Sequence, residues 1–310
     1  MLNMPPLLVI LGATAVGKTA LSLHIAEQIE SEVVSADSRL FYRQMDIGTA
    51  KPTAAEMGDI PHHCIDIANP DETVTLGWYQ RHCYGTIDAI HERGKLPILV
   101  GGTGQYVQAV VEGWGIPEIP PNDALRAELS ERDAADLHAQ LTELDAVAAA
   151  KLHPNNKRRV IRALEVCLIA GRPISDLQKK SPPPYNITII GLRSPRKWLY
   201  ERIDRRVDLM MEAGLLDEVK GLVGMGYGRH TPAMSGLGYQ QLLDYLDRTL
   251  TLDEAVERIK YETHRFVRHQ NNWFERQIQN VNWFDVTAAD YPKSTIEQIT
   301  AVYNKEHGTR

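Results

Sequence analysis

The stretch Gly12-Ala13-Thr14-Ala15-Val16-Gly17-Lys18-Thr19 decides the fold of this chain. It matches the phosphate-binding pattern G-x-x-x-x-G-K-[ST] and stands between the apolar run Leu7–Leu11 and the helical pattern Thr19–Glu30. In such a loop, backbone N–H groups face an anion, and the N-terminus of the following helix adds partial positive charge. We therefore predict a strand, a phosphate loop and a helix, with Lys18 reaching phosphate oxygens and the Thr19 hydroxyl joining the coordination of Mg²⁺.

The segments around this loop alternate between short apolar runs and longer amphipathic stretches. Glu32–Ser35 and Leu96–Val100 are expected to be strands, whereas Leu76–Arg93 is expected to be a helix. Strands separated by helical patterns indicate a parallel sheet with helices on its faces. The predicted fold class is α/β, with a P-loop NTPase-like core.

Two proline-rich stretches bracket a helical segment in the middle of the chain. Trp114–Pro121 cannot form regular helix or a central strand, and Ser181–Pro184 is a second break. Between them, Asn122–Ala170 consists almost entirely of helix-forming residues. We therefore divide the chain into a core, residues 1–112 and 186–310, and a helical insertion, residues 113–185, with Ile187–Leu192 as the strand that resumes the core.

The rest of the chain is predicted to be mostly helical. Helices are expected over Pro195–Ala213, Leu215–Met225, Gly238–Leu246 and Leu252–Gln279. In the last of these, Ile259, Phe266 and Trp273 follow heptad steps, which indicates a buried face. The residues beyond Asn282 show no pattern that predicts an element.

The composition excludes several classes of protein. With 43% hydrophobic and 24% charged residues among 310, the chain has the balance of a globular protein. No apolar run reaches the ~18 residues of a membrane span. The cysteines, Cys64, Cys83 and Cys167, stand far apart and predict a reducing compartment, so we expect a cytoplasmic protein. We also expect a monomer without membrane contact. The net charge of −6 means that nucleic-acid binding must come from local basic patches.

Polar residues follow two further predicted strands. Asp37 comes just after Glu32–Ser35, and Thr103 lies in the glycine-rich run that follows Leu96–Val100. The carboxyl ends of parallel strands meet at one sheet edge, so both residues are expected to face the phosphate loop. Asp37 could be a general base toward an acceptor, a magnesium ligand or only the cap of the turn that follows it. Thr103 could contact a ligand or belong to an ordinary glycine turn.

Two basic segments are candidates for contact with RNA. Lys151–Arg162 carries five Lys or Arg and no acid, and Arg158 and Arg162 share a helix face. In the last long helix, steps of three and four residues join Tyr261, Arg265, Arg268, Asn272 and Arg276. Such groups can hold an RNA backbone or an unstacked base. A solvated helix face with ordinary salt bridges accounts for either segment equally well.

The sequence resembles the bacterial tRNA dimethylallyltransferases (tRNA isopentenyltransferases) in a series of motifs and in their order. The resemblance extends to about Phe284. The motifs are GATAVGKT at Gly12–Thr19, SADSRLFY at Ser35–Tyr42, GTAKP at Gly48–Pro52, PHHCIDI at Pro61–Ile67, VGGTGQY at Val100–Tyr106, RRVIRALEV at Arg158–Val166, RVDLMMEAGLLDEV at Arg206–Val219, GLGYQQ at Gly236–Gln241 and RHQNNWF at Arg268–Phe274. The resemblance implies transfer of a dimethylallyl group from dimethylallyl diphosphate to N6 of adenosine 37 in tRNAs that read codons beginning with U.

The same resemblance assigns roles to single residues. Lys18, Arg206 and the amides of Gly12–Thr19 would hold the diphosphate, with Mg²⁺ at Thr19. The catalytic set would be Asp37, as the base near N6, and Thr103, beside the adenine, together with Lys18 and Arg206. Contacts to the anticodon stem-loop would come from Asp37, Ser38, Arg39, Leu40, Thr103, Arg126, Arg158, Arg159, Val160, Ile161, Arg162, Ser235, Gly236, Leu237, Gly238, Tyr239, Gln240, Arg268, His269, Gln270 and Trp273. Ser235, Gln240, His269 and Asn272 depart from residues found in other family members.

Three other functions share parts of this pattern. A small P-loop kinase also places a carboxylate after its second strand, but it transfers a γ-phosphoryl group to a hydroxyl. A transferase that acts on free AMP or ADP would not need the basic segments. A non-catalytic RNA-binding NTPase would not need Asp37. A turnover assay with dimethylallyl diphosphate and tRNA, against ATP and AMP, separates these functions.

Overall fold

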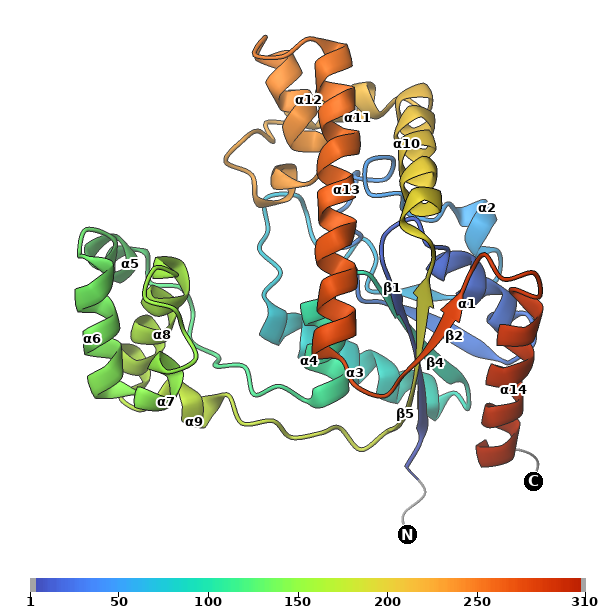
Figure 1. Cartoon of the computed structure of the whole chain (residues 1–310), viewed down its shortest axis with the longest axis horizontal. Coiled ribbons are helices and arrows are strands. Elements are labelled where there is room, and N and C mark those ends of the chain that lie inside the picture. The colour runs from blue at the N-terminus through green and yellow to red at the C-terminus, as the bar shows by residue number, and fades with distance from the viewer. Residues whose placement is uncertain (1–3, 308–310) are drawn as a thin grey trace. The chain divides into compact units, whose positions relative to one another are not determined.

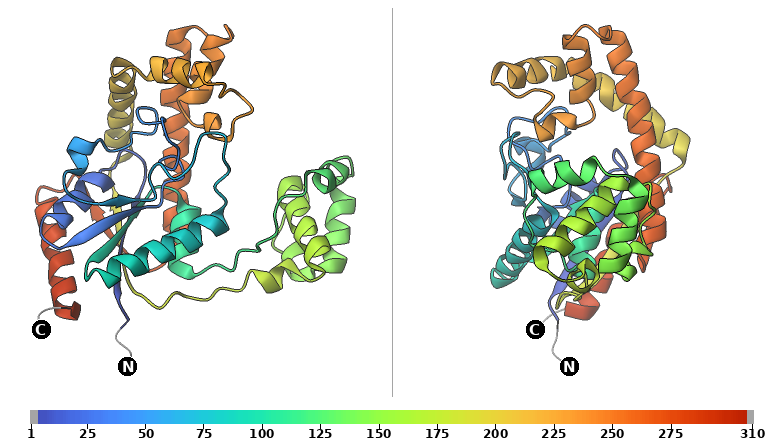
Figure 2. Two further views of the ribbon diagram at one scale, coloured as in Figure 1. Left: turned by 180° about the vertical axis from the view of Figure 1, so that it is seen from behind. Right: turned by 90° about the vertical axis from the view of Figure 1, so that its left-hand side faces the viewer.

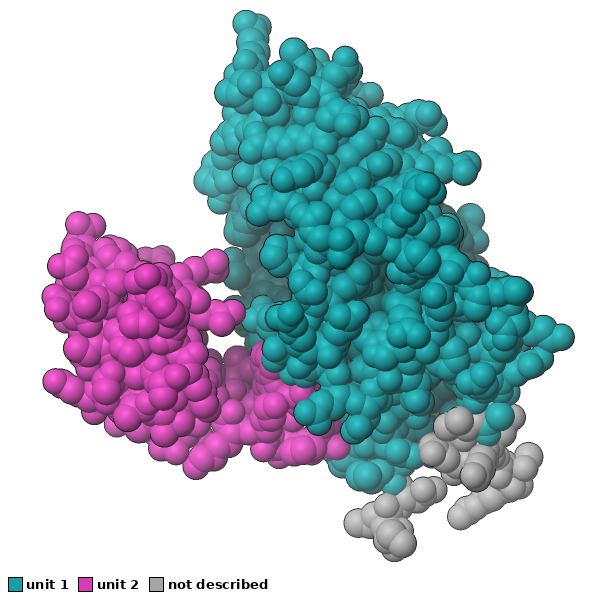
Figure 3. Space-filling view, viewed as in Figure 1, with its two compact units in different colours: residues 1–110, 184–310 teal, residues 111–183 magenta. Residues whose placement is uncertain are grey.

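The computed structural model describes residues 4–307 of the chain. The chain divides into two compact units, residues 1–110 with 184–310 (unit 1) and residues 111–183 (unit 2), which are coloured separately in Figure 3. Within the described residues, no helix is long and apolar enough to cross a membrane.

A single parallel sheet forms the centre of unit 1. Its strands, among the described residues, are β1 (Pro6–Gly12), β2 (Ser31–Ser35), β3 (His62–His63), β4 (Leu96–Gly101), β5 (Asn186–Arg193) and β6 (Val281–Asp285). They lie in the order β3-β2-β4-β1-β5-β6, and every pairing is parallel. The predicted α/β class is confirmed. Because β1 lies between β4 and β5, the phosphate loop begins at the middle of the carboxyl edge of the sheet (Figure 1).

Helices cover the sheet and extend beyond it. They are α1 (Lys18–Ala26), α2 (Ala54–Met57), α3 (Leu76–Glu92), α4 (Gly104–Glu112), α10 (Arg196–Glu212), α11 (Leu215–Gly224), α12 (Tyr239–Leu246), α13 (Leu252–Gln277) and α14 (Lys293–His307), with the 3-10 helix η1 (Pro232–Ser235). Leu8 and Ile10 of β1 belong to an apolar cluster that includes residues of α1, α10 and α14. Helix α14 lies beside α1 at one edge of unit 1 (Figure 2).

A second apolar cluster lies beyond the carboxyl ends of the strands. It joins α10, α11, α12 and α13 through residues such as Val207, Leu215, Leu242 and Ile259, and the cluster includes Tyr42 and Met45 from the segment after β2. Helix α13 runs from this helical layer down along the sheet, as Figure 1 shows. The carboxyl edge of the sheet therefore faces a helical layer across the loops that carry the predicted site.

Several features of unit 1 differ from the sequence prediction. Elements α2, β3, α4, η1, β6 and α14 were not predicted; β3 has two residues, and β6 is an edge strand without a fully buried residue. Helix α1 ends at Ala26, short of the predicted Glu30. The prediction that Phe266 is buried was wrong, since its side chain is 42% exposed. The buried positions on α13 are Ala255, Ile259, Val267, Gln270 and Phe274, because a straight helix drifts about 20° per heptad from a strict seven-residue repeat.

Unit 2 is a small helical bundle. Its helices are α5 (Asp123–Ser130), α6 (Ala134–Leu144), α7 (Ala146–Ala149), α8 (Lys157–Ala170) and α9 (Ile174–Leu177). Leu129, Leu137, Leu141, Val160 and Leu164 are at most 1% exposed and form the centre of its apolar cluster. Unit 2 thus has a hydrophobic core of its own, as a separate folding unit requires.

Candidate active site

The phosphate loop depends on backbone conformations that favour glycine. Gly12 has φ +151° and Gly17, the residue before α1, has φ +111°. A Cβ atom on Gly12 would lie 2.7 Å from the carbonyl oxygen of Leu192 on β5. Ala15 adopts φ +64°, and its carbonyl accepts a hydrogen bond of 3.0 Å from Arg202 Nε of α10. Sequence reasoning missed Arg202, although it stands one helical turn before Arg206.

The ammonium group of Lys18 contacts the backbone of the phosphate loop. Its Nζ donates hydrogen bonds of 3.0 Å to the carbonyl groups of both Gly12 and Ala13. Burial lowers the pKa of Lys18 to about 8, although the carboxylate of Asp37 favours the charged form. Lys18 is half-buried, so its charge is screened less than on the open surface and favours an anion bound by the loop.

Asp37 and Lys18 converge on Gly102. A Cβ atom on Gly102 would lie 3.4 Å from Lys18 Nζ and 3.6 Å from Asp37 Oδ2. Asp37 Oδ1 accepts a hydrogen bond of 3.0 Å from the N–H of Arg39. The capping role that the sequence left open for Asp37 therefore occurs, but it uses Oδ1 and leaves Oδ2 on the side of Lys18.

Thr103, in the loop after β4, forms hydrogen bonds with the loop after β2. Its Oγ1 accepts a hydrogen bond of 3.2 Å from the N–H of Ser38 and lies 3.4 Å from Ser38 Oγ. The two loops also touch at Gly101, where a Cβ atom would lie 2.4 Å from the carbonyl oxygen of Ala36. Asp37 and Thr103 are thus held side by side, as parallel strand ends predict.

A pocket of about 260 Å³ connects these loops with the helical layer. Thr14, Asp37, Thr103 and Arg206 give it polar groups. Its apolar lining comes from Ile203, Val207, Met210, Leu215, Ile259 and Phe266, and further walls are Gly48–Ala50 and Ser235–Tyr239. Burial, together with the nearby Arg202, holds the pKa of Arg206 below its usual value. The pocket therefore combines cations, a carboxylate and an apolar wall, which suits an organic group attached to an anionic leaving group.

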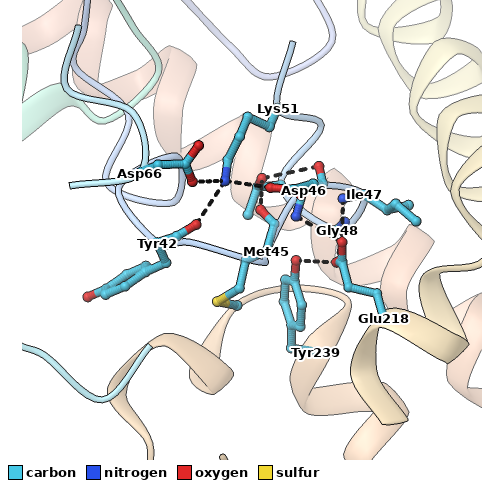
Figure 4. A network of polar contacts seen from close by, with 10 residues as sticks. Tyr42, Met45, Asp46, Ile47, Gly48, Lys51, Asp66, Glu218 and Tyr239 are labelled. Carbon is cyan, nitrogen blue, oxygen red and sulfur yellow. Dashed lines mark hydrogen bonds and ion pairs between the residues drawn. The ribbon is translucent and has the colours of Figure 1, made fainter. Parts of the chain in front are cut away.

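Glu218 of α11 holds the loop that carries Gly48 (Figure 4). Its Oε2 accepts from the N–H groups of Asp46 at 2.8 Å and Ile47 at 2.7 Å. Its Oε1 accepts from the N–H of Gly48 at 3.1 Å and from the hydroxyl of Tyr239 at 2.7 Å. Sequence reasoning missed Glu218, because its partners lie 170 or more residues earlier in the chain or on another helix. Its place in the motif Arg206–Val219 was the available signal.

Comparisons with known proteins match the whole of this site. The IPP transferase family model matches residues 40–277, and the isopentenyl transferase model matches residues 5–68. The tRNA dimethylallyltransferase of Roseiflexus castenholzii is 53% identical over 291 residues, which cover 93% of this chain and 95% of that one. The chain belongs to the tRNA dimethylallyltransferase family. The enzyme of that name from Thermomicrobium roseum is 45% identical, over 97% of this chain and 92% of its own.

Solved structures of tRNA dimethylallyltransferase relatives share the fold. The full-length tRNA isopentenylpyrophosphate transferase of Bacillus halodurans is 43% identical and aligns with a TM-score of 0.73, covering 97% of this chain and 96% of that one. A eukaryotic dimethylallyltransferase described as acting on tRNA is 28% identical, with a TM-score of 0.85 over 97% of this chain and 79% of its own. The P-loop NTPase-like core expected for the family is therefore present.

The residues predicted to contact tRNA in this family member differ in exposure. Ser235, Gln240, Arg268 and His269 are exposed in unit 1, and Arg158 and Arg159 are exposed in unit 2. Ser38, Arg39, Leu40, Ile161, Leu237 and Trp273 are half-buried. Gly236 and Gly238 are buried. Val160, Tyr239 and Gln270 are at most 6% exposed and face internal partners. The exposed residues are the ones that a bound RNA would contact. The buried side chains would instead support the protein surface from within.

Two of the predicted RNA-binding arginines are occupied within unit 2. Arg126 and Arg162 both pair with the carboxylate of Glu165, whose side chain is fully buried. Arg162 also donates to the carbonyl of Ile119 at 2.9 Å. Lys157 Nζ lies 2.5 Å from the carbonyl oxygen of Ser130. Arg126, and Lys157 and Arg162 of the basic segment, therefore have structural partners within unit 2.

Proposed function

We propose that this protein transfers a dimethylallyl group from dimethylallyl diphosphate to N6 of adenosine 37 in the anticodon loop of tRNAs that read codons beginning with U. The observation that carries the proposal is the pocket that joins Arg206 to Asp37 and Thr103 along an apolar wall, with Lys18 Nζ and Asp37 Oδ2 both close to Gly102. The names of the relatives, tRNA dimethylallyltransferase and tRNA isopentenylpyrophosphate transferase, support the same reaction. The C1–O bond of the donor breaks as the N6–C1 bond forms, and diphosphate leaves.

The phosphate loop would stabilise the leaving group. Charge develops on the diphosphate as its bond to the allylic carbon breaks, and preorganised donors favour that charge. Lys18 uses two of its three N–H donors on the carbonyl groups of Gly12 and Ala13, so one donor is left for a phosphate oxygen. Arg206, which lines the same pocket from α10, would supply a second cation.

Asp37 would serve the acceptor. The exocyclic nitrogen of adenine is a weak nucleophile, because its lone pair is delocalised into the ring. A carboxylate that accepts its proton as the bond to carbon forms helps the reaction. Asp37 is suited to this role because Oδ1 is anchored by the N–H of Arg39 and Oδ2 lies on the side of Lys18. The adenine must leave the loop stack to reach the pocket, as in other enzymes that modify bases.

A magnesium ion fits the same site. The structure places Thr19 exposed in the first turn of α1, and the described residues contain no group of three or more His, Cys, Asp or Glu that could hold a metal. Mg²⁺ commonly takes one or two protein ligands and fills its other positions with substrate phosphate and water. The Thr19 hydroxyl would therefore hold the ion together with the diphosphate. When bound, the ion would neutralise part of the charge of the leaving group.

A turnover assay tests this proposal. Purified protein is incubated with labelled dimethylallyl diphosphate and a tRNA transcript that reads codons beginning with U. We expect label in the tRNA, release of one diphosphate for each group transferred, and no transfer when adenosine 37 is replaced by guanosine. AMP and ATP are offered in parallel as acceptor and phosphoryl donor. Prenylation of AMP, or phosphoryl transfer from ATP without prenylation, would contradict the proposal in favour of one of the alternative enzymes.

A further inference from the structure

Gln270 lies inside unit 1, although its neighbours in sequence face outward. It belongs to the segment of α13 predicted to contact tRNA, but it is only 6% exposed. Arg268 and His269, which precede it, are exposed. Val267 and Phe274, at most 1% exposed, pack the same helix against the interior on either side of Gln270. The side chain of Gln270 therefore points away from the surface that an RNA would meet.

The amide of Gln270 joins two loops of the site. Its Oε1 accepts a hydrogen bond of 2.9 Å from the N–H of Thr14 in the phosphate loop. Its Nε2 donates a hydrogen bond of 2.7 Å to the carbonyl of Gly102, in the loop after β4. One contact needs an acceptor and the other needs a donor. A neutral primary amide supplies both, whereas a carboxylate supplies only acceptors.

The two loops carry opposite halves of the reaction. Thr14 belongs to the loop that would hold the diphosphate, with Lys18 at its end. Gly102 lies against Lys18 Nζ and Asp37 Oδ2 and precedes Thr103, so its loop supports the acceptor side. A side chain that hydrogen-bonds to both loops fixes the distance between the donor and the acceptor groups. A misplacement of about 1 Å between reacting groups can lower a rate about 100-fold.

We propose that Gln270 is a positioning residue, which sets the phosphate loop and the loop Gly101–Thr103 at the separation that transfer requires. The inference rests on the proposed function. Gln270 touches neither the diphosphate nor the RNA in this role. Its loss is therefore expected to lower kcat for the transfer by about 10- to 100-fold, with little change of KM for tRNA.

The variant Gln270→Glu gives the sharpest test. A protonated glutamic acid reproduces both contacts, because its carbonyl accepts from Thr14 and its O–H donates to Gly102. An ionised glutamate opposes the carbonyl of Gly102. The ratio of its kcat to that of the wild type should rise as the pH falls from 8 to 5.5, by up to tenfold per pH unit above the pKa of the carboxyl. If burial keeps the carboxyl protonated throughout, the variant is close to wild type at every pH.

Three further variants complete the comparison. Gln270→Leu removes both contacts and is expected to stay 10- to 100-fold below wild type at every pH, without the rise. Gln270→Asn, whose amide is too short to reach both loops, replaces it if the leucine variant does not fold, as judged by circular dichroism. Gln277→Glu places the same charge at the exposed end of α13 and is expected to follow the wild-type pH profile.

The outcomes separate this inference from the proposed function. An inactive wild type contradicts the proposed function itself. If the wild type is active, a leucine variant with normal kcat overturns the inference, and so does a glutamate variant that is equally impaired at every pH. A raised KM for tRNA with normal kcat would also overturn it, because that result assigns Gln270 to RNA binding. Titration with inorganic diphosphate provides a readout without turnover, in which the leucine variant should bind more weakly than Gln277→Glu.

Discussion

Arg126 holds Glu165 with two parallel hydrogen bonds, Nε to Oε1 and Nη2 to Oε2, each 2.9 Å long. The N–H of Asn122 adds a third bond of 2.7 Å, and Arg162 adds a fourth contact to the same carboxylate. Burial alone would raise the pKa of Glu165, but these contacts hold it below its usual value. An ionised, fully buried carboxylate of unit 2 is thus surrounded by donors. An arginine predicted from sequence to meet RNA has a structural role here.

We predict that Arg126→Ala destabilises the protein by about 1–3 kcal/mol, because Glu165 then loses two charge-assisted hydrogen bonds in the interior. Arg158→Ala, at an exposed position on α8, should change stability by less than about 0.5 kcal/mol. Urea unfolding of both variants provides the measurement. Because the folded pKa of Glu165 is lowered, its contribution is present above the unfolded pKa and is lost as the pH falls through the folded one. The difference between Arg126→Ala and wild type should therefore shrink in acid. An equal loss of stability in both variants would contradict this account.

The activity of the free enzyme should depend on the charge of Lys18. Its pKa of about 8 means that the ammonium is charged at neutral pH and loses its proton as the pH rises. We expect kcat/KM for dimethylallyl diphosphate to fall above pH 8, approaching tenfold per pH unit, because only the charged form stabilises the leaving group. In Lys18→Arg the guanidinium keeps its charge, so the activity that remains should show no such fall. A wild-type profile that stays level to pH 9.5 would remove Lys18 from this role.

Asp37→Asn separates the two roles of Asp37. The asparagine oxygen still accepts from the N–H of Arg39, so the turn is retained, but the amide cannot take a proton from N6. We expect the single-turnover rate to fall by about 10²–10⁴, the usual contribution of a general base, with tRNA affinity nearly unchanged. A variant that reacts at the wild-type rate would show that Asp37 only shapes the turn.

The sequence predicted the parts of this molecule that depend on neighbouring residues. The order strand, glycine loop and helix around Lys18 follows from local pattern, and the ends of parallel strands bring Asp37 and Thr103 to the same edge. Other features depend on distant partners. No spacing in the sequence reveals that Glu218 accepts hydrogen bonds from the Gly48 loop. Nor does it reveal that the side chain of Gln270 points inward within a segment predicted to contact RNA. Which residues of α13 are buried likewise depends on how the helix packs. The heptad pattern predicted that Phe266 is buried, and it is exposed.

The contacts of Glu218 lead to a further prediction. Glu218→Ala leaves the N–H groups of Asp46, Ile47 and Gly48 without their acceptor, so we expect a loss of about 1–3 kcal/mol of stability. Tyr239→Phe removes one hydroxyl donor and should cost about 1 kcal/mol. Both changes break the same hydrogen bond. The double variant should therefore lose less stability than the sum of the losses in the two single variants. Urea unfolding of the four proteins measures this coupling, and strict additivity would show that the hydroxyl contact contributes nothing.

The exposed pair Arg158 and Arg159 should carry the salt dependence of tRNA binding by unit 2. Lys157 and Arg162 of the same segment already have partners in that unit, whereas these two side chains are exposed on the first turn of α8. Each phosphate contact contributes about 0.7–0.9 to the slope of log K against log salt, so the double alanine variant should lower the slope by about 1.4–1.8 and weaken binding. Lys179→Ala, which removes an exposed lysine paired with Asp176, serves as the control and should leave the slope unchanged. Affinity for dimethylallyl diphosphate should stay the same in both, since its proposed site lies in unit 1. A double variant with the wild-type slope and affinity would show that α8 presents only a solvated basic face.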